Sequence, residues 1–205
     1  MPHPTFFNLP KEKQDFIMNA VLDELSIHDY EAFNISNIIR ATGIARGSFY
    51  QYFKDKDDLY AYFYTYIGQL KYQYYGNLFD PTHDIPLIER LNLIFEKGLL
   101  FRKDYPKLVD VARLMLHSSF IRNDPNYHKN LSLALDLYES FVKRDIELGI
   151  IRNDLDSRTL AELIMVVFNH LTQDKLINQT LDDLSIKMML NHILNIIEKG
   201  VTPHV

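Results

Sequence analysis

Apolar residues recur at steps of three and four positions along most of this chain, which is the spacing of amphipathic helices. The first such run predicts a helix from about Pro10 to His28, with Pro10 in the first turn, where a missing N–H costs nothing. Its apolar face is expected to hold Phe16, Ile17, Ala20, Val21 and Leu25. With two short helices at 34–53 and longer ones beyond, the pattern predicts an all-α chain of about nine helices.

Capping and breaking residues place the ends of the longer helices. Asp55 is expected to cap a helix that runs to about Asn77, with Asp58 also at its positive end. Further helices are predicted over about 86–103, 106–118, 125–148 and 183–199, the last two closed by Gly149 and Gly200. Between them, Asp156 or Ser157 caps a helix whose apolar side carries Leu160, Leu163, Ile164, Val167, Phe168 and Leu171.

The segment from Asn34 to Phe53 has the spacing of a helix-turn-helix. Ser36 is expected to cap its first helix, and Gly43 lies where the turn between the helices needs a positive φ. The second helix, from about Arg46, buries Phe49 and Phe53 at positions i and i+4. The remaining, outward face carries Arg46, Gly47, Ser48, Tyr50, Gln51 and Tyr52. Arg and Gln can address guanine and adenine in the major groove, while hydroxyl groups suit phosphate oxygens.

The spacing of this segment leaves two interpretations open. Two short helices around a glycine also occur in helical proteins that bind no nucleic acid, and Tyr50 and Tyr52 fit half-buried aromatic positions as well. On the DNA-binding interpretation, Lys56 at the start of the next helix can hold a phosphate together with the free N–H groups there.

Composition and charge narrow the class of protein. The 205 residues include 47% hydrophobic and 24% charged residues, the balance of a globular protein. Net charge is −5, but residues 34–56 hold four basic groups against one acidic group, a small basic region that fits a DNA-binding surface. Because there is no signal peptide after Met1 and no apolar run near 20 residues, we expect a soluble, cytoplasmic protein without membrane partners.

Catalytic and metal chemistry find little support in the sequence. There is no cysteine, no Gly-rich phosphate loop, and no His-x-x-x-His or Glu-x-x-His spacing among the eight histidines. Asp124 and His128 are four apart, but Pro125 between them indicates a surface loop. We therefore expect no enzyme, no metal site and no cofactor.

The residues from Phe33 to Leu59 resemble a known family. Phe33, the run Ile38-Ile-Arg-Ala-Thr-Gly-Ile-Ala-Arg-Gly-Ser-Phe-Tyr-Gln-Tyr-Phe53 and Lys56-Asp-Asp-Leu59 are similar to the N-terminal signature of the tetracycline-repressor (TetR) family of bacterial regulators. The resemblance implies a three-helix DNA-binding domain over 1–55, with its helix-turn-helix at about 33–53, and an effector-binding and dimerisation domain over 56–205. One departure is that residues 1–33 are acidic overall.

The resemblance also implies roles for individual residues. Those expected at the DNA are Ser36, Asn37, Thr42, Ala45, Arg46, Gly47, Ser48, Tyr50, Gln51, Tyr52 and Lys56. The implied function is a repressor that leaves a palindromic operator when a small, mainly apolar or aromatic effector binds. Candidate pocket residues are Tyr64, Phe95, Phe101, His117, Phe120, Tyr138, Phe141, Phe168 and His170, although aromatic residues at helical spacing are more often plain core.

A homodimer is expected because a monomer reading one half-site would bind weakly. The last two long helices are the candidate interface, through Leu160, Ile164, Val167, Phe168, Leu171, Ile193, Ile196 and Ile197, unless these rows fill the subunit's own core. Two other functions remain as alternatives, a helical protein–protein adaptor and a DNA-binding regulator that responds to no ligand. The polar face from Arg46 to Tyr52 argues against an adaptor, which should expose an apolar surface there.

Overall fold

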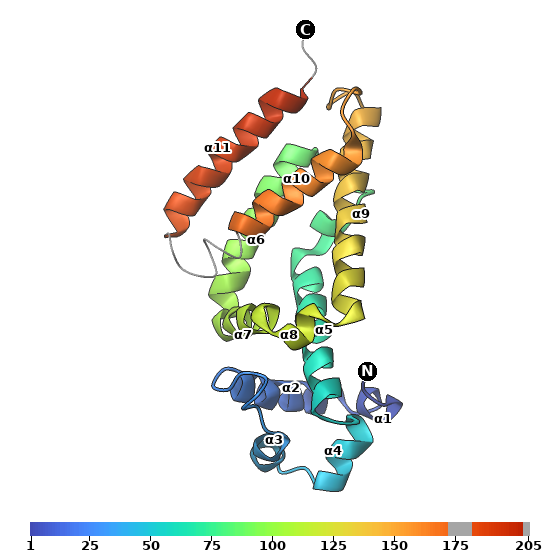
Figure 1. Ribbon diagram of the computed structural model, residues 1–205, viewed down its shortest axis with the longest axis vertical. Helices are drawn as coiled ribbons and strands as arrows, with labels where there is room; N and C mark the ends of the chain where they lie inside the picture. Colours follow the sequence, from blue (N-terminus) through green and yellow to red (C-terminus); the bar gives the residue numbers. More distant parts are fainter. Residues whose placement is uncertain (172–181, 203–205) are drawn as a thin grey trace. The chain divides into compact units, whose positions relative to one another are not determined.

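The computed structural model describes residues 1–171 and 182–202, and these residues form helices joined by short loops, without strands (Figure 1). Nine of the helices have at least seven residues, as predicted. They are α2 (Lys11–Leu25), α3 (Ile35–Thr42), α4 (Arg46–Tyr52), α5 (Lys56–Tyr75), α6 (Leu87–Asp104), α7 (Pro106–His117), α9 (Pro125–Glu147), α10 (Ser157–Asn169) and α11 (Asp183–Val201). None of the described helices is long and apolar enough to cross a membrane.

Three short elements were not predicted from the sequence: α1 (Pro4–Phe7), the 3-10 turn η1 (Gly76–Phe79) and α8 (Ser119–Arg122). The predicted stop at Gly200 was wrong, because α11 continues through it to Val201. Gly149 does end α9, with a φ of 71°, and Asp156 caps α10 by accepting a hydrogen bond from the Thr159 N–H at 2.8 Å.

The chain divides into two compact units. Unit 1 combines residues 1–71 with 105–124, and unit 2 combines 72–104 with 125–205. Helix α5 thus begins in unit 1 and ends in unit 2. The boundary expected after residue 55 separates DNA binding from effector binding and dimerisation, whereas these two units are defined by compactness. The functional boundary stays a prediction.

Unit 1 is built around aromatic and branched side chains from α1 to α5. Ile17 and Val21 of α2, Ile38 of α3 and Phe49 of α4 are all fully buried. Phe16 was expected on the buried face of α2, but it is 53% exposed because the face turned to the core is that of Ile17, Val21 and Leu25.

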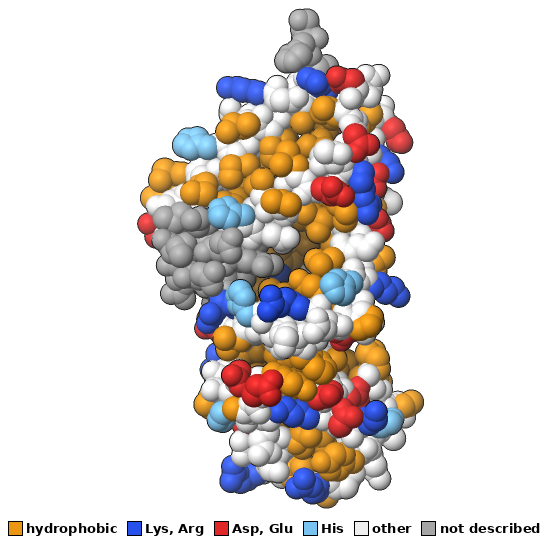
Figure 2. All heavy atoms as spheres, in the orientation of Figure 1, with side chains coloured by type: hydrophobic (Ala, Val, Ile, Leu, Met, Phe, Trp, Pro, Cys, Tyr) orange, Lys and Arg blue, Asp and Glu red, His pale blue; other side chains and the backbone are white. Residues whose placement is uncertain are grey.

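Unit 2 exposes an apolar face on α10 and α11. Leu163 and Val166 of α10, and Met188 and Ile196 of α11, are 52%, 67%, 51% and 72% exposed, respectively. Figure 2 shows hydrophobic side chains gathered where these two helices lie. This corrects part of the predicted dimer interface, because Leu160, Ile164, Phe168, Leu171 and Ile197 are buried in the core of unit 2. Val167 and Ile193 are partly buried against that core, which leaves Ile196 as the predicted interface residue on the open face.

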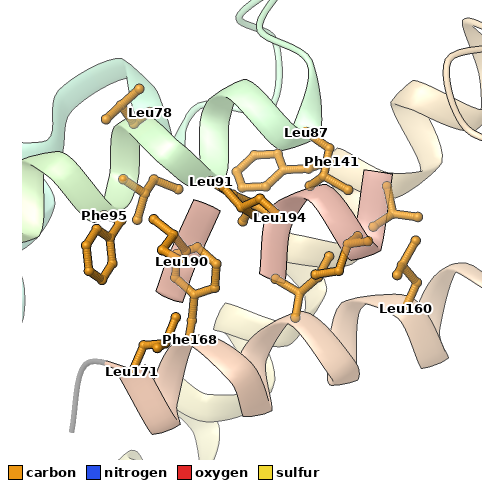
Figure 3. Close-up of a cluster of buried hydrophobic side chains, with 14 of the residues drawn as sticks. Leu78, Leu87, Leu91, Phe95, Phe141, Leu160, Phe168, Leu171, Leu190 and Leu194 are labelled. Atoms are coloured by element: carbon orange, nitrogen blue, oxygen red, sulfur yellow. The ribbon is translucent and has the colours of Figure 1, made fainter. Parts of the chain in front are cut away.

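The core of unit 2 joins α6, α9, α10 and α11. Phe95, Phe141, Phe168, Leu190 and Leu194 converge in it, as Figure 3 shows. Burial of such side chains contributes roughly 1.5–3 kcal/mol each before the entropy of ordering is subtracted. Packing in this core is therefore enough to explain why these aromatic residues are present.

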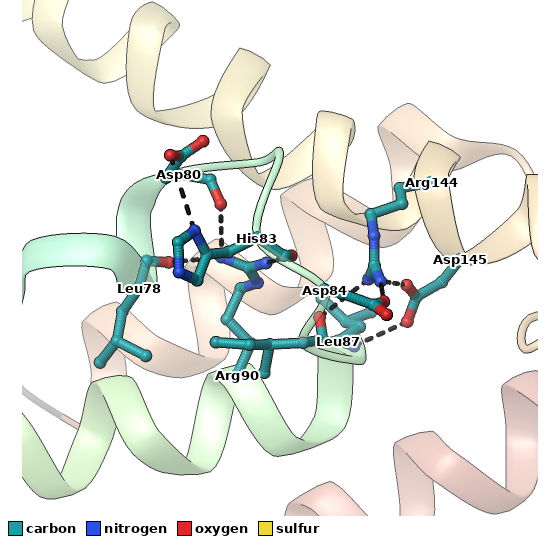
Figure 4. Close-up of polar contacts among 9 residues, drawn as sticks. Leu78, Asp80, His83, Asp84, Leu87, Arg90, Arg144 and Asp145 are labelled. Atoms are coloured by element: carbon teal, nitrogen blue, oxygen red, sulfur yellow. Dashed lines mark hydrogen bonds and ion pairs between the residues drawn. The ribbon is translucent and has the colours of Figure 1, made fainter.

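Two arginines stabilise the loop before α6 by hydrogen bonds to its backbone (Figure 4). Arg90 is fully buried and donates to the carbonyl oxygens of Leu78, Asp80 and His83 at 2.9, 2.9 and 2.6 Å, with its guanidinium 4.3 Å from the Phe141 ring centre. Arg144 donates to the carbonyl oxygen of Ile85 at 2.9 Å. These bonds satisfy buried and half-buried backbone acceptors, which are costly to leave without a donor.

Candidate DNA-binding site

The turn between α3 and α4 has the geometry that the sequence predicted. Gly43 ends α3 with a φ of 65°, and its N–H donates to the carbonyl oxygen of Ile39 at 2.9 Å. The expected cap at Ser36 was wrong by two positions: Asn34 caps α3, and its side chain accepts from the Ser36 N–H at 2.8 Å. Asn and Ser are both good capping residues, so composition does not separate the two positions.

Helix α4 places its polar side chains outward. Phe49 and Phe53 are fully buried, and this fixes the helix on the core of unit 1. Arg46, Gly47, Tyr50 and Gln51 are exposed, and Ser48 is half-buried. The Arg46 guanidinium lies 6.0 Å from the centre of the Tyr50 ring, one turn away. The predicted recognition face thus exists as an open surface on α4.

The short helix α1 holds the C-terminal end of α4. The N–H of His3 donates to the carbonyl oxygen of Tyr52 at 2.8 Å, and the Thr5 hydroxyl donates to that of Gln51. Phe6 is fully buried, with its ring centre 4.9 Å from that of Phe53. Tyr52 was expected to face outward, but it is 8% exposed and packs edge-on against Phe6. The N-terminal segment therefore covers the last turn of α4.

The polar residues of α3 already have partners within unit 1. Asn37 donates to Glu24 at 2.9 Å and accepts from Arg40 at 2.7 Å. The Thr42 hydroxyl donates to the carbonyl oxygen of Ile38 at 2.7 Å. Arg40 is exposed and was not among the predicted contacts, although it was counted in the basic region.

Asp55 and Asp58 fix the start of α5 as expected. Asp55 accepts from the Asp58 N–H at 2.9 Å, and the Asp58 side chain accepts from the Lys54 N–H at 3.1 Å. Lys56 donates to the carbonyl oxygen of Glu31 at 3.1 Å, and its ammonium lies 4.8 Å from the Tyr30 ring centre. The neighbouring Lys54 is exposed, and its ammonium lies 3.7 Å from the Asp55 carboxylate.

Tyr30, whose ring faces the Lys56 ammonium, is itself held by two neighbours. It donates a 2.5 Å hydrogen bond to Asp57 and stacks on Phe120 with ring centres 4.7 Å apart. Burial, and then the Asp57 carboxylate, raise the pKa of Tyr30 to about 12. Tyr30 stays protonated at neutral pH, as a donor to Asp57 must.

The residues predicted to line an effector pocket are divided between the two units. Phe95, Phe101, Phe141 and Phe168 are buried in unit 2, each less than 7% exposed. Tyr138 is half-buried there, with burial raising its pKa to about 12, and His170 is exposed. In unit 1, Tyr64 and Phe120 are half-buried, and His117 borders a cavity of about 250 Å³ beside Tyr60 and Met115. Within the described residues, no group of three or more His, Cys, Asp or Glu is placed to hold a metal ion.

Comparison with known proteins agrees with this arrangement. Residues 17–63 match the family model described as "Bacterial regulatory proteins, tetR family". The chain is 23% identical to an uncharacterized HTH-type transcriptional regulator of Bacillus subtilis (strain 168), YdgC, over 94% of each chain. A TetR-family regulator from Chloroflexus aurantiacus is 26% identical over the full length of both chains, with a TM-score of 0.66. FadR from Bacillus subtilis in complex with stearoyl-CoA is 21% identical, with 91% of this chain and 98% of that one covered and a TM-score of 0.72.

The fold and the exposed face of α4 define a helix-turn-helix regulator, and the matched residues 17–63 contain α3 and α4 in full. Residues 17–63 therefore form the DNA-binding domain of a regulator of the TetR family. Proteins of this family are DNA-binding transcription factors, not enzymes, and they act as dimers that bind operator DNA and small-molecule effectors.

Proposed function

We propose that this chain is a repressor that binds a two-fold symmetric operator as a homodimer in the cytoplasm and leaves it when a small effector binds. The observation that carries the proposal is the exposed polar face of α4. Arg46 and Gln51 supply the groups that address base edges, and Gly47 leaves room for a close approach of the backbone. The buried Phe49 and Phe53 make this face rigid.

The apolar face on α10 and α11 supports the dimer. Four large apolar side chains there, Leu163, Val166, Met188 and Ile196, are each more than half exposed. Exposed apolar residues that gather on one face indicate an interaction surface. A second copy of the same face would cover them in a four-helix arrangement.

Selection of bound sequences from a random duplex library at near-physiological salt tests the DNA-binding part. We expect recovery of a palindrome with half-sites about one helical turn apart, roughly 34–36 Å, or a near multiple. Recovery of no sequence by a folded, dimeric protein contradicts this part and favours the adaptor alternative.

For the effector, we propose an apolar chain with an acidic group, such as a fatty acyl thioester of coenzyme A. The similarity to FadR with stearoyl-CoA supports this class. Two cations of unit 1, Lys71 and Arg113, have no hydrogen-bond or ion-pair partner among the described residues, and the Arg113 Nε is buried. Lys71 is solvent-accessible, yet desolvation by nearby protein lowers the pKa of its ammonium. An anion beside either cation would compensate for that loss of water.

Release of labelled operator by acyl-CoA thioesters of increasing chain length tests the effector class. We expect release by long-chain thioesters and a weaker response in Arg113→Met, while coenzyme A alone leaves the complex intact. Arg152→Met is the matched control, since Arg152 is paired with Asp154 at 2.8 Å in unit 2. A protein that binds its operator but responds to none of these compounds contradicts the effector class only.

A further inference from the structure

Glu24 is a buried acidic residue beside the helix-turn-helix. It lies in the last turn of α2 and is 8% exposed. One of its carboxylate oxygens accepts from the Asn34 N–H at 3.0 Å and from the Asn37 side-chain amide at 2.9 Å. The Nδ1 atom of His28 lies 3.2 Å from the same oxygen. A buried carboxylate is costly unless donors surround it, so this one group joins the end of α2 to the start of α3.

The Asn37 side chain connects this carboxylate to Arg40. Its NH₂ group donates to Glu24, and its amide oxygen accepts from the Arg40 guanidinium at 2.7 Å. An ionised carboxylate only accepts and a guanidinium only donates, so the two partners allow a single orientation of the amide. The three side chains thus form a chain of hydrogen bonds from the buried end of α2 to the surface of α3.

Arg40 ends this chain of hydrogen bonds on an exposed face. Ser36, four positions earlier, is exposed on the same face of α3. Figure 2 shows basic side chains over both α3 and α4. Arg102 and Arg158 of unit 2 are paired with carboxylates, whereas Arg40 has no ion pair among the residues that the structure describes. Because its partner is a neutral amide, Arg40 keeps its charge and most of its N–H donors for an external anion.

We propose that Arg40 binds an operator phosphate and that Glu24 is a positioning residue for this contact, acting through Asn37. The inference rests on the proposed function, because it adds a contact to the same DNA-binding surface. The bond to Asn37 limits the directions that the Arg40 guanidinium takes, so less side-chain entropy is lost when a phosphate binds. Glu24 therefore favours DNA binding by geometry although its charge opposes it.

Charge and geometry predict opposite effects of removing Glu24. Loss of a negative charge alone strengthens binding to DNA, which is itself negative. Glu24→Met keeps much of the side-chain volume but removes the acceptor of both bonds, and it should weaken operator binding several-fold. Glu24→Gln keeps an oxygen that can accept both bonds and should retain most of the affinity.

Asp23→Asn is the matched control for charge. Asp23 precedes Glu24 on α2, is exposed, and is paired with Lys107 at 2.8 Å. The substitution removes the same charge without touching the bonds to α3. It should bind the operator as tightly as the wild type or slightly more tightly.

The experiment is a titration of the selected operator with the full chain at several salt concentrations. Arg40→Met should weaken binding roughly tenfold, the loss of a charged hydrogen bond, and should reduce the salt slope by about one for each half-site. The double variant Glu24→Met, Arg40→Met should bind about as well as Arg40→Met alone, because Glu24 acts through Arg40. A purely structural role of Glu24 would make the two losses additive.

A second variant covers the case in which Glu24→Met does not fold. Asn37→Ala interrupts the chain of bonds at its middle and leaves the Asn34 N–H bonded to Glu24. It too should weaken operator binding and add little to the loss in Arg40→Met. Nuclear magnetic resonance of the Asn37 side-chain amide, measured without DNA, should show its signal shifted in Arg40→Met and in Glu24→Met.

The possible outcomes separate this inference from the proposed function. The inference alone is overturned if folded Glu24→Met binds the operator as tightly as the wild type, if the losses are additive, or if the Asn37 amide signal is unchanged in Arg40→Met. A folded wild-type chain that binds no duplex overturns the proposed function as well.

Discussion

Arg46 is the single residue on which DNA recognition should depend most. It is exposed on α4, and the Tyr50 ring one turn away limits the directions that its guanidinium takes. Arg46→Ala should cost roughly 1–3 kcal/mol of specific binding if it addresses a base, and it should relax preference at one base position of each half-site. Titration of the selected operator and of a scrambled duplex measures the two affinities. Equal loss on both duplexes would reassign Arg46 to the phosphate backbone.

Glu139 should make stability depend on pH in the acid range. Hydrogen bonds from Lys143, Arg158 and Ser157 lower the pKa of its carboxyl to about 2. Because the folded pKa lies below the unfolded one, the stabilisation is complete above the unfolded value, about 4.5, and is lost as pH falls towards 2.

Denaturant unfolding of Glu139→Gln at a series of pH values checks this expectation. Its free energy of unfolding should fall less steeply than that of the wild type between about pH 5 and pH 2. Glu147→Gln, without a bonded partner among the described residues, should keep the wild-type slope. An unchanged slope in Glu139→Gln would show that the ion pairs to Lys143 and Arg158 do not persist in solution.

At the scale of elements, two glycines of the helix-turn-helix should respond differently to alanine. A Cβ at either Gly43 or Gly47 would meet nothing within 4 Å in the protein. Gly43 has a φ of 65°, so Gly43→Ala should destabilise unit 1 by roughly 1–2 kcal/mol through backbone strain alone. Gly47 is in α4 without a positive φ, so Gly47→Ala should raise stability by up to about 1 kcal/mol.

The same pair separates stability from DNA binding. The methyl group of Gly47→Ala lies on the exposed face of α4, where we expect it to obstruct the backbone's approach to DNA and to weaken operator binding. Thermal unfolding and operator titration of both variants give the two quantities. Normal operator affinity of a folded Gly47→Ala protein would mean that DNA does not approach α4 at this position.

Helix positions could be read from the sequence because their determinants are local. Asp55, Asp156 and Gly149 act on their own helix ends, so capping and positive φ located those ends correctly. Helix α1 was missed because it has four residues and no side-chain cap, and the buried Phe6 holds it in place. A contact between Phe6 and Phe53, 47 positions apart, leaves no periodic pattern.

The buried faces were harder to predict than the helices. Leu160 and Leu163 are three positions apart on α10 and are both leucines. Leu160 is nevertheless 7% exposed and Leu163 is 52% exposed. An apolar row wide enough for two surfaces does not reveal which edge faces the subunit's own core. Arg90 was missed for a related reason, because its burial depends on the carbonyl oxygens of Leu78, Asp80 and His83. Nothing about Arg90 in the sequence distinguishes it from an exposed arginine.

At the scale of the whole molecule, function rests on association, and the exposed face of α10 and α11 gives a direct test. Val166 and Ile196 are 67% and 72% exposed, so charging them leaves the core of the subunit intact. The double variant Val166→Glu, Ile196→Glu should be monomeric, since placing charge in an apolar interface costs several kcal/mol. Ile27→Glu, at a site that is 76% exposed in unit 1, is the matched control and should stay dimeric.

Sedimentation at micromolar protein measures the dimer, and operator titration measures its consequence. If the dimer joins two recognition helices, the monomeric variant should lose most of its affinity for the full palindrome and keep its weak affinity for a half-site. A double variant that remains dimeric would place the interface away from Val166 and Ile196. A monomer that still binds the palindrome tightly would instead remove the reason for the dimer, because one α4 would then suffice for recognition.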